Sequence, residues 1–598
     1  MDFIVHEGTF HMRRVRFSLK AAVVLTAALS FLSASVRVSA RPIVFRTSFP
    51  GGDIPSIDPS LVEEPYGIQL VDELTVGLLR MNEETLKLDP GIAERYEISE
   101  TGNTVTFYLR TDVPWVRYDS ERGAVERVVD CRGAARFVTS ADFVYGIERT
   151  LRPETAAPFA FLLNKVVAGA AAYNDGSNPD FGAVGIRAID ERTLTVDLVS
   201  ASPYTLNILS LWMFRAEPGW LIEGDDCTEA YGDRWAETDA FQGYGPFTLK
   251  SWTHDAELTL IRNPFWPASE AIPSARIDEV TMLMISETSA IAEYEAGNLD
   301  YAIVGYSDYD RLESDPCYAD ALVGKPLNVG TEAVLFNHLL PPTDDVRVRR
   351  ALSLAIDRAA VAAALKSGTP ARYWIHPSAI GAPDPGTADE FGAETDVSRA
   401  KALIDDYCAE KGIEPGELTL TYYYSSSDLH QIRGQVLAEM WRGALGINVV
   451  LENSDWGVFK DVRKEGRHHI YRTAWNQDYL DANNFTADVF LCPGGYYQPS
   501  TDWPMEGCAE PLDADPLYTA YAELLDSAAS ERDPARRAEL YARSEKILIR
   551  EAAILSPISY NDATYLLNPI FQVPTTRTGY DRWEKWGVVP EREPFTED

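Results

Sequence analysis

The sequence lacks the short motifs that mark the common hydrolases and nucleotide-binding enzymes. It has no G-x-S-x-G nucleophile motif, no zinc-binding H-E-x-x-H and no phosphate-binding P-loop. Cysteine and histidine are scarce, with six and eight in 598 residues, and no cysteines show the C-x-x-C spacing of zinc or redox sites. No catalytic activity and no cofactor or metal are expected. A pair of carboxylates for glycoside hydrolysis stays open, because acidic residues are abundant.

Basic residues are in deficit. The chain has 54 Lys and Arg against 91 Asp and Glu, a formal net charge of −37. A charge of this sign and size repels nucleic acids and anionic membrane surfaces, so neither is expected as a partner. The excess of carboxylates is typical of a solvated acidic surface and says little about the charge of any one pocket.

Long hydrophobic runs are absent after the first 40 residues, and the mean hydropathy is −0.19. Basic Arg13, Arg14 and Arg16 precede an apolar run of 12 residues, Ala21–Leu32, and the small residues Val38-Ser39-Ala40 follow. The run is short for a membrane span of about 20 residues. The pattern predicts a secretory signal at 1–40 with cleavage after Ala40. No cysteine follows the run for lipid attachment, so a periplasmic or extracellular location is expected.

Cleavage would remove five basic and two acidic residues and lower the net charge from −37 to −40. All six cysteines lie in the exported part, where an oxidising compartment permits disulfides. Cys492 and Cys508 bracket a loop rich in Gly and Pro and are the best pair. Cys131–Cys227 is a second possibility.

The length predicts two or three domains. Alternation of apolar and polar residues predicts a half-buried strand at 104–110. Helices are expected from Pro65 to about Arg80 and from Asp345 to Leu365, and residues 113–138 read as a long polar insertion. The order strand 417–424, helix 429–445, strand 447–451 predicts parallel pairing in a separate α/β unit.

The most informative stretch is Arg472–Phe485. It begins as a strand with bulky and β-branched residues and then becomes a polar turn segment rich in Asp and Asn. Arg472, Trp475 and Asp478 are spaced along it. An Asp can hold an ammonium group, an Arg can hold a carboxylate, and a Trp offers a flat apolar wall. This pattern suits a ligand with an ammonium group and a carboxylate, such as a peptide.

Seven short motifs recur in the order known from one large family. They are Ile57–Pro59 with 76–79, Leu88–Tyr96, Thr139–Tyr145, Gly243–Leu249, Arg262–Trp266, Ala296–Asp300 and Asp345–Arg358. Over nearly the whole exported part the chain resembles the family 5 solute-binding proteins of ABC transporters, the periplasmic oligopeptide-, dipeptide- and nickel-binding proteins. Each motif alone is weak, and their order makes the resemblance specific.

The resemblance implies a two-lobe α/β fold of the periplasmic-binding-protein type II, cluster C. Lobe I would comprise 41–330, with an extra subdomain at about 82–200, and lobe II 331–555. Residues 556–598 would return to lobe I. Two crossing segments near 329–335 and 555–560 would form the hinge, and the ligand would lie between the lobes.

The resemblance also implies a binding site. Asp478 matches the residue that captures a peptide's α-ammonium group, and Arg472 matches one that can pair with the carboxylate of short peptides. Backbone groups of Ala474, Trp475 and Asn476 would pair with the peptide as an added strand. The loop with Glu63 and Tyr66 would line the site, and Phe159 stands where the family usually has Tyr.

The family pattern implies a monomer that passes a peptide or other small solute to ABC permease subunits in the inner membrane. The family also contains binders of nickel complexes and sugars, so an oligosaccharide or a nickel chelate is the alternative ligand. A secreted hydrolase is a third reading, and a receptor that signals to a membrane partner a fourth. Adjacent His468 and His469 on a strand would point to opposite faces, which disfavours a shared metal.

Overall fold

The computed structural model describes residues 42–49, 53–491 and 516–589. No helix in these ranges is long and apolar enough to cross a membrane. The predicted signal at 1–40 and the Cys492–Cys508 pair lie outside the described residues. The described residues from 43 onward form one compact unit.

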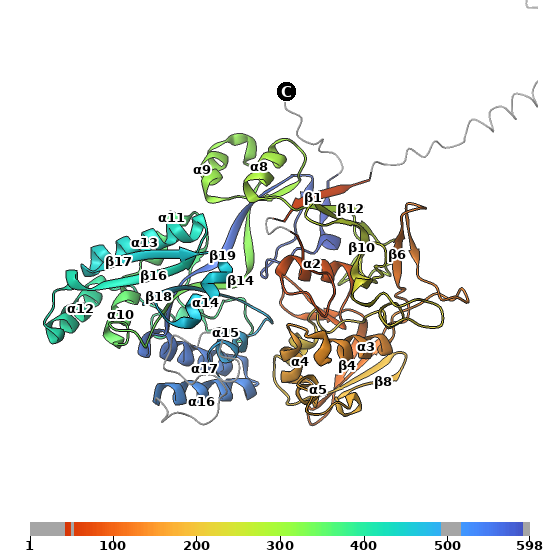
Figure 1. Cartoon of the computed structure of the whole chain (residues 1–598), viewed down its shortest axis with the longest axis horizontal. Helices are drawn as coiled ribbons and strands as arrows, with labels where there is room; N and C mark the ends of the chain where they lie inside the picture. Colours follow the sequence, from red (N-terminus) through yellow and green to blue (C-terminus); the bar gives the residue numbers. More distant parts are fainter. Residues whose placement is uncertain (1–41, 50–52, 492–515, 590–598) are drawn as a thin grey trace, which may run out of the picture. The chain divides into compact units, whose positions relative to one another are not determined.

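The described strands fall into several sheets (Figure 1). The first four-stranded sheet has the order β1-β12-β11-β10, with β1 Val44–Ser48, β10 Phe247–Thr253, β11 Glu257–Arg262 and β12 Glu279–Leu283. The second has the order β4-β5-β9-β8, with β4 Ala93–Ile98, β5 Thr104–Leu109, β8 Ile186–Asp190 and β9 Thr193–Asp197. Strand β5 alternates buried and partly buried residues, which confirms the predicted half-buried strand.

The largest sheet has the order β13-β19-β14-β18-β16-β17, with β15 beside β19. Its strands are β13 Tyr301–Ile303, β14 Leu322–Phe336, β15 Thr369–Pro370, β16 Thr419–Ser425, β17 Asn448–Ser454, β18 Ile470–Asn476 and β19 Leu555–Leu567. Strands β16 and β17 are parallel and are joined by helix α13 Asp428–Leu445. The predicted strand–helix–strand unit is therefore confirmed.

The remaining elements are short strands and helices. The strands are β2 Leu79–Met81, β3 Leu88–Pro90, β6 Val116–Asp119, β7 Ala124–Arg127, β20 Phe571–Gln572 and β21 Gly587–Val588. The helices before strand β14 are α2 Pro65–Leu74, α3 Ser140–Leu151, α4 Ala160–Val166, α5 Ala170–Asn174, α6 Thr205–Leu209, α7 Gly219–Ile222, α8 Glu287–Glu295 and α9 Tyr306–Ser314. The later helices are α10 Val346–Leu354, α11 Arg358–Leu365, α12 Val397–Lys411, α14 Trp456–Glu465, α15 Ala482–Phe490, α16 Pro516–Ser530 and α17 Pro534–Lys546.

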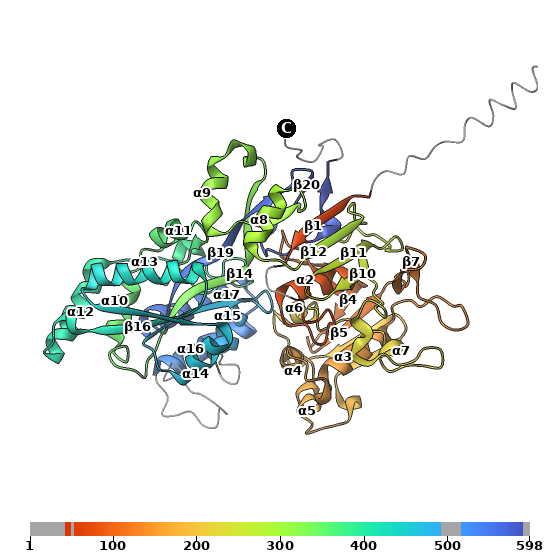
Figure 2. The same ribbon diagram turned by 45° about the horizontal axis from the view of Figure 1, so that its top comes forward.

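Helices cover both faces of the large sheet. Successive side chains of a strand point to opposite faces, so neighbouring residues of one strand enter different cores. Ile470 of β18 packs in one core with residues of α10–α13, and the neighbouring Tyr471 packs in another core with residues of α15–α17. Figure 2 shows α13 and α15 on different sides of these strands. The face of β18 that carries Tyr471 and Trp475 therefore faces the helices that follow it in the chain.

Strands β14 and β19 pair antiparallel over most of their length, and Leu335 lies opposite Leu555. They contain the two segments predicted to cross between lobes, 329–335 and 555–560. The boundaries of the lobes and of the subdomain remain a prediction.

Two predicted helices are wrong in extent. The helix from Pro65 stops at Leu74, because Thr75 is extended and its hydroxyl donates to the carbonyl of Val71. The helix predicted at 345–365 is two helices, since Asp357 has an extended backbone and its side chain caps a new helix through the N–H of Ala360. Apolar periodicity runs through both breaks, so it does not reveal them.

The last described segment packs onto the beginning of the chain. Trp583 and Trp586 are almost fully buried in the core that contains Phe45 of β1. Arg582 forms an ion pair of 2.6 Å with Asp72 of α2, and Lys585 lies 2.9 Å from Glu83. Residues from the first and last described segments thus complete one core.

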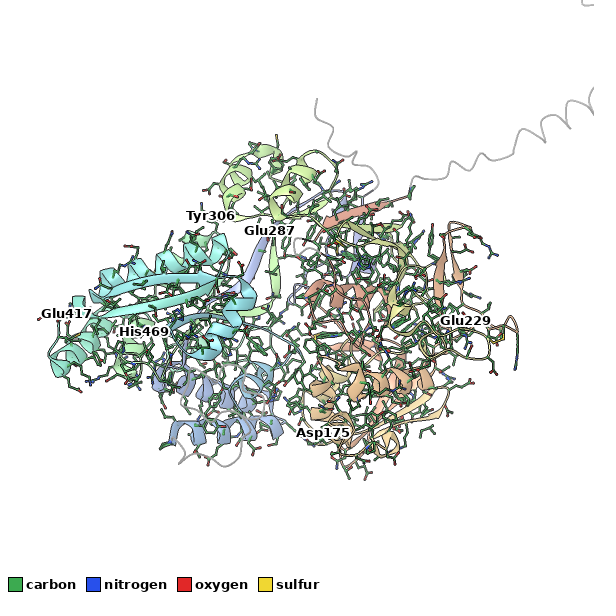
Figure 3. The ribbon with its side chains drawn as sticks, in the orientation of Figure 1. Asp175, Glu229, Glu287, Tyr306, Glu417 and His469 are labelled. Carbon is green, nitrogen blue, oxygen red and sulfur yellow. A yellow bond between two sulfur atoms is a disulfide. The ribbon has the colours of Figure 1, made fainter. Side chains whose placement is uncertain are left out.

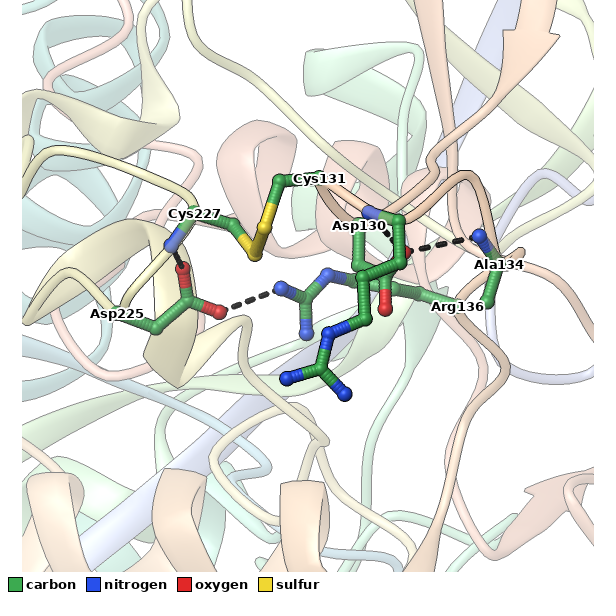
Figure 4. Close-up of a disulfide and its surroundings, with 7 residues drawn as sticks. Asp130, Cys131, Ala134, Arg136, Asp225 and Cys227 are labelled. Carbon is green, nitrogen blue, oxygen red and sulfur yellow. Dashed lines mark hydrogen bonds and ion pairs between the residues drawn. A yellow bond between two sulfur atoms is a disulfide. The ribbon is translucent and has the colours of Figure 1, made fainter.

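A disulfide fastens the insertion at 113–138. The structure joins Cys131 to Cys227, with 5.1 Å between their Cα atoms and 96 residues of separation (Figure 4). Beside it, Arg136 of the same insertion pairs with Asp225. The insertion itself contains the hairpin β6–β7. Cys317 is exposed and Cys408 is buried, both as free thiols.

Reduction of this disulfide should lower the stability of the protein. Closing a loop of about 100 residues is worth at most about 4–5 kcal/mol, and about 2–4 kcal/mol is typical. Thermal unfolding with and without a reductant measures the effect. Without reductant, the Cys131→Ser/Cys227→Ser variant should already melt below the wild type, because it lacks only the Cys131–Cys227 bond. A wild-type melting curve that reductant leaves unchanged would contradict this expectation.

Candidate functional site

The loop after β18 is held at both ends. Its first end leaves the sheet at Asn476, where β18 pairs with Gly330 of β14. Its second end is Asp481, whose side chain caps α15 by accepting from the N–H of Asn483 at 2.9 Å. The guanidinium group of Arg537 in α17 donates hydrogen bonds to both carboxylate oxygens of Asp481, at 2.7 and 2.9 Å. The loop 477–480 between these anchors is therefore positioned by the fold.

Asp478 is partly buried in this loop and is held by one amide. The side-chain Nδ2 of Asn484, on the first turn of α15, donates to Asp478 Oδ2 at 2.9 Å. The Oδ1 of the same Asn484 accepts from the backbone N–H of Asp478, also at 2.9 Å. Among the described residues no cation lies within ion-pair distance of Asp478.

Burial is the main reason why the pKa of Asp478 is raised to about 7. The hydrogen bond from Asn484 opposes this rise, the nearby carboxylate of Asp488 adds to it, and Lys165 opposes it. A carboxylate that is only half ionised at neutral pH becomes fully charged when a cation binds beside it. Asp478 is thus suited to a cationic ligand group.

Asp478 lines a narrow cleft with a free volume of about 40 Å³, which is open to solvent on one side. Its walls come from α2, β2, the segment after α6, the loop after β18 and the last described segment of the chain. The lining residues are Ile68, Asp72, Arg80, Met81, Glu83, Ser210, Leu211, Trp212, Arg215, Gln477, Asp478, Tyr479, Leu480, Thr578, Tyr580 and Arg582. Distant segments therefore converge on Asp478.

The other charged side chains that line the cleft form ion pairs, either with one another or with residues outside the lining. Asp72 binds Arg215 and Arg582 at 2.6 Å each. The two guanidinium groups outweigh the effect of burial, which acts in the opposite direction, and hold the pKa of Asp72 at about 2. Arg80 pairs with Glu584 at 2.9 Å. Within the described part of the chain, Asp478 is the cleft carboxylate that lacks such a counter-ion.

Trp475 and its neighbours stand beside the cleft and do not line its described part. The Nε1 of Trp475 donates to Asn484 Oδ1 at 3.0 Å, and its ring packs against the core around Tyr471. Ala474 lies opposite Glu332 in β14. Asn476 is exposed and its side-chain oxygen accepts from Asn561 at 3.2 Å. Trp475 and Asp478 thus share one anchor, Asn484.

Arg472 is engaged in a buried ion-pair cluster. Its guanidinium pairs with Glu332, with Nε at 3.0 Å from Oε2, and Arg433 reaches the same oxygen at 3.0 Å. Although burial opposes it, the two arginines lower the pKa of Glu332 to about 2. The sequence could not reveal this partner, which lies 140 residues away. A ligand carboxylate would have to share Arg472 with Glu332.

The predicted residues of the first half lie at different places. Glu63 is exposed, while its neighbour Glu64 caps α2 by accepting from the N–H of Gly67 at 2.8 Å. Tyr66 is partly buried against Phe49, with ring centres 4.6 Å apart. These residues do not line the described cleft.

Phe159 touches the cleft only indirectly. It packs edge-on against Trp212, with ring centres 5.0 Å apart, and Trp212 is part of the lining. Its role is apolar support of the wall.

Sequence reasoning missed three residues around Asp478. Asn484 and Asp488 are four apart in α15 and so share a helix face, and this spacing was the available signal. Lys165 of α4 reaches Asp488 at 2.5 Å, from 323 residues away. No local pattern could have indicated that contact.

His468 and His469 do not share a site. The Nε2 of His468 lies 3.0 Å from Glu452, whereas His469, which is labelled in Figure 3, accepts from the N–H of Thr421 at 3.0 Å. The described residues contain no group of three His, Cys, Asp or Glu that could hold a metal ion.

Comparison with known proteins gives matches over most of the chain. The chain is 27% identical over 518 residues to the probable deoxycholate-binding periplasmic protein YgiS of Escherichia coli, covering 86% of this chain and 87% of YgiS. It is also 27% identical to the periplasmic oligopeptide-binding protein OppA of Salmonella typhimurium, covering 92% and 94%. The structure of the Escherichia coli murein tripeptide binding protein MppA matches with a TM-score of 0.69 and 25% identity, covering 92% of this chain and 99% of MppA.

Residues 87–497 match the family described as bacterial extracellular solute-binding proteins, family 5 Middle. This match covers more than half of the chain and includes β18, Asp478 and Asn484. The fold of the solved relatives agrees with the mixed α/β structure found here. The chain therefore belongs to the family 5 bacterial extracellular solute-binding proteins.

Proposed function

We propose that this protein is the exported binding component of an ABC importer and captures peptides that have a free amino terminus. It holds the peptide between two lobes and delivers it to permease subunits in the inner membrane. The relatives named OppA are oligopeptide-binding proteins, and MppA is named for a murein tripeptide. Residues 1–40 act as the export signal, and the protein works as a monomer that carries out no chemistry.

The observation that carries the proposal is Asp478. It is a cleft carboxylate, oriented by Asn484 and without a counter-ion among the described residues. Burial holds its pKa at about 7, so a cation is needed to keep it charged. A peptide α-ammonium group can donate hydrogen bonds to this carboxylate and supply the charge.

An anionic ligand that has no ammonium group is disfavoured by the same residue. The relative YgiS is named as a probable deoxycholate binder, and deoxycholate is an anion. Its charge would be repelled by Asp478, and the arginines of the cleft, Arg80, Arg215 and Arg582, already pair with Asp72 or Glu584. Peptide is therefore the preferred ligand, with an oligosaccharide or nickel chelate as the alternatives to exclude.

A ligand screen by thermal unfolding tests the proposal. Free-amine di- to pentapeptides should raise the melting temperature, since a ligand at 100 times its Kd adds about 2.7 kcal/mol of stability. N-acetylated peptides of the same sequence should have little effect. C-terminal amidation of the peptide should reduce this stabilisation less than N-acetylation does, because Arg472 already pairs with Glu332. Stabilisation by deoxycholate, a sugar or nickel, with none by peptides, would overturn the peptide assignment.

A further inference from the structure

Two carboxylates meet at the amide of Asn484. Its Nδ2 donates to Asp478 Oδ2 at 2.9 Å and to Asp488 Oδ2 at 3.2 Å. Its Oδ1 is used by the N–H of Asp478 and the indole of Trp475. Asn484 is fully buried and has no spare hydrogen-bonding group. The two carboxylates are therefore fixed next to each other, where like charges repel.

Lys165 compensates one of these carboxylates. Its Nζ lies 2.5 Å from Asp488 Oδ1 and 2.8 Å from the hydroxyl of Tyr479. That hydroxyl donates to Asp488 Oδ2 at 2.7 Å. Tyr479 is fully buried and packs in the core of the α3–α6 region, the region that contains Lys165. Lys165 and Asp488 are themselves only about one-fifth exposed.

Among the described residues, Lys165 is the main cation near the two carboxylates of Asp478 and Asp488. Tyr479 and Tyr580 face them as neutral phenols whose pKa values are raised, chiefly by burial. Asp481 lies near Tyr479 but is bound on both oxygens by Arg537. Among the described residues, Lys165 is the cation within ion-pair distance of Asp488, and none is that close to Asp478.

We propose that Lys165 is a positioning residue for the ligand's ammonium group and acts through Asp488 and Asn484. Lys165 takes up the charge of Asp488, so that Asp488 does not compete for the ligand or oppose the ionisation of Asp478. Asn484 then presents the carboxylate of Asp478, which has no counter-ion in the described part of the cleft. Lys165 belongs to α4, in a different region from Asp478, so the ammonium site is complete only when the two regions meet. This inference rests on the proposed function.

A charge-rescue experiment tests this role in the purified protein with a free-amine tripeptide as the probe. Lys165→Met should weaken binding about 10- to 100-fold at pH 7, because Asp488 then opposes the charge on Asp478. Lys165→Arg should keep most of the affinity. Lys165→Met/Asp488→Asn should recover to within about five-fold of the wild type. A matched control is Lys401→Met, which removes an exposed Lys–Asp pair of α12 and should change nothing.

Recovery of peptide affinity in the double variant distinguishes a positioning role of Lys165 from a structural contact between α4 and α15. The double variant lacks the ion pair altogether, so a merely structural contact would leave it as weak as Lys165→Met. Equal weakness of the two, or an unaffected Lys165→Met, would overturn the proposal. The affinity of Lys165→Met should also improve between pH 6 and pH 7.5 more steeply than that of the wild type, because Asp478 ionises later in the variant.

A second readout needs no ligand. The carboxyl carbon of Asp478, assigned by comparison with Asp478→Asn, should titrate at a higher pH in Lys165→Met than in the wild type. An unchanged titration would refute the role of Lys165 even if peptides bind. If the wild type binds no peptide but the titration moves as expected, the proposed ligand falls and the coupling of Lys165 to Asp478 stands.

Discussion

Asp478→Asn should abolish the binding of free-amine peptides and at the same time stabilise the unliganded protein at pH 8. The loss of a charged partner in a cleft costs about 2–5 kcal/mol, so the Kd should rise at least about 30-fold. The amide can still accept the hydrogen bond from Asn484 Nδ2, so the local geometry is kept. Isothermal titration with a tripeptide and its N-acetylated form measures the loss.

The gain in stability follows from the titration of Asp478. Its folded pKa is about 7, mainly because of burial, whereas an unfolded Asp has a pKa of about 3.9. The stability that protonation gives the folded protein is therefore fully present below about pH 4 and is lost as pH rises through 7. At pH 8 the variant avoids a cost of up to about 4 kcal/mol.

Thermal unfolding between pH 4 and pH 8 checks the direction of this effect. The variant should be the more stable protein at pH 8, and the difference should shrink towards pH 4. Wild-type binding at pH 6 should also release protons, since the ligand forces Asp478 to ionise. A variant that binds peptides normally, or that is less stable than the wild type at pH 8, would contradict the assignment.

Arg537→Met should be strongly destabilising. Arg537 and Asp481 are 4% and 0% exposed in their side chains, and removal of one partner of a buried pair costs about 3–5 kcal/mol. Burial raises the pKa of Asp481 even with Arg537 in place. The lone carboxylate of the variant should therefore be tolerated at low pH, where it is protonated, and the loss of stability should grow as pH rises.

Adjacent Arg536 offers a matched control. It is mostly exposed and lies 3.6 Å from Glu531, so Arg536→Met should change stability by less than about 0.5 kcal/mol. Arg537→Met/Asp481→Asn should regain part of the loss, because Asn is also a good helix N-cap. Denaturant unfolding at pH 5 and pH 8 compares the four proteins. Equal effects of the Arg536 and Arg537 variants would show that the buried pair is unimportant.

The sequence predicted those parts of the fold and site that depend on local patterns. Alternation identified β5, and the strand–helix–strand order identified the parallel pair β16 and β17. Asp478 could be singled out because it follows a strand in a turn-forming segment and because its segment resembles a known family. Its place in a cleft was an expectation that depended on the resemblance.

The partners of these residues could not be predicted, because the fold brings them from far along the chain. Arg472 looked like a ligand for a carboxylate, but its counter-ion Glu332 is 140 residues away. Lys165 had no local feature to mark it. The ends of α2 and α10 were missed because a single residue, Thr75 or Asp357, overrides apolar periodicity through its own hydrogen bonds.

The packing of Trp583 and Trp586 into the core around β1 has a consequence for the order in which the protein can fold. Arg582 and its partner Asp72 are 510 residues apart. The core around β1 therefore cannot be completed until Trp583 and Trp586 have been synthesised. Such distant contacts make folding slow. With the proposed export signal at residues 1–40, slow folding would keep the chain unfolded for longer before it crosses a membrane. Removal of residues 571–598 should make the segments around β1 sensitive to limited proteolysis. Digestion at the wild-type rate would show that residues 571–598 are not needed for this core.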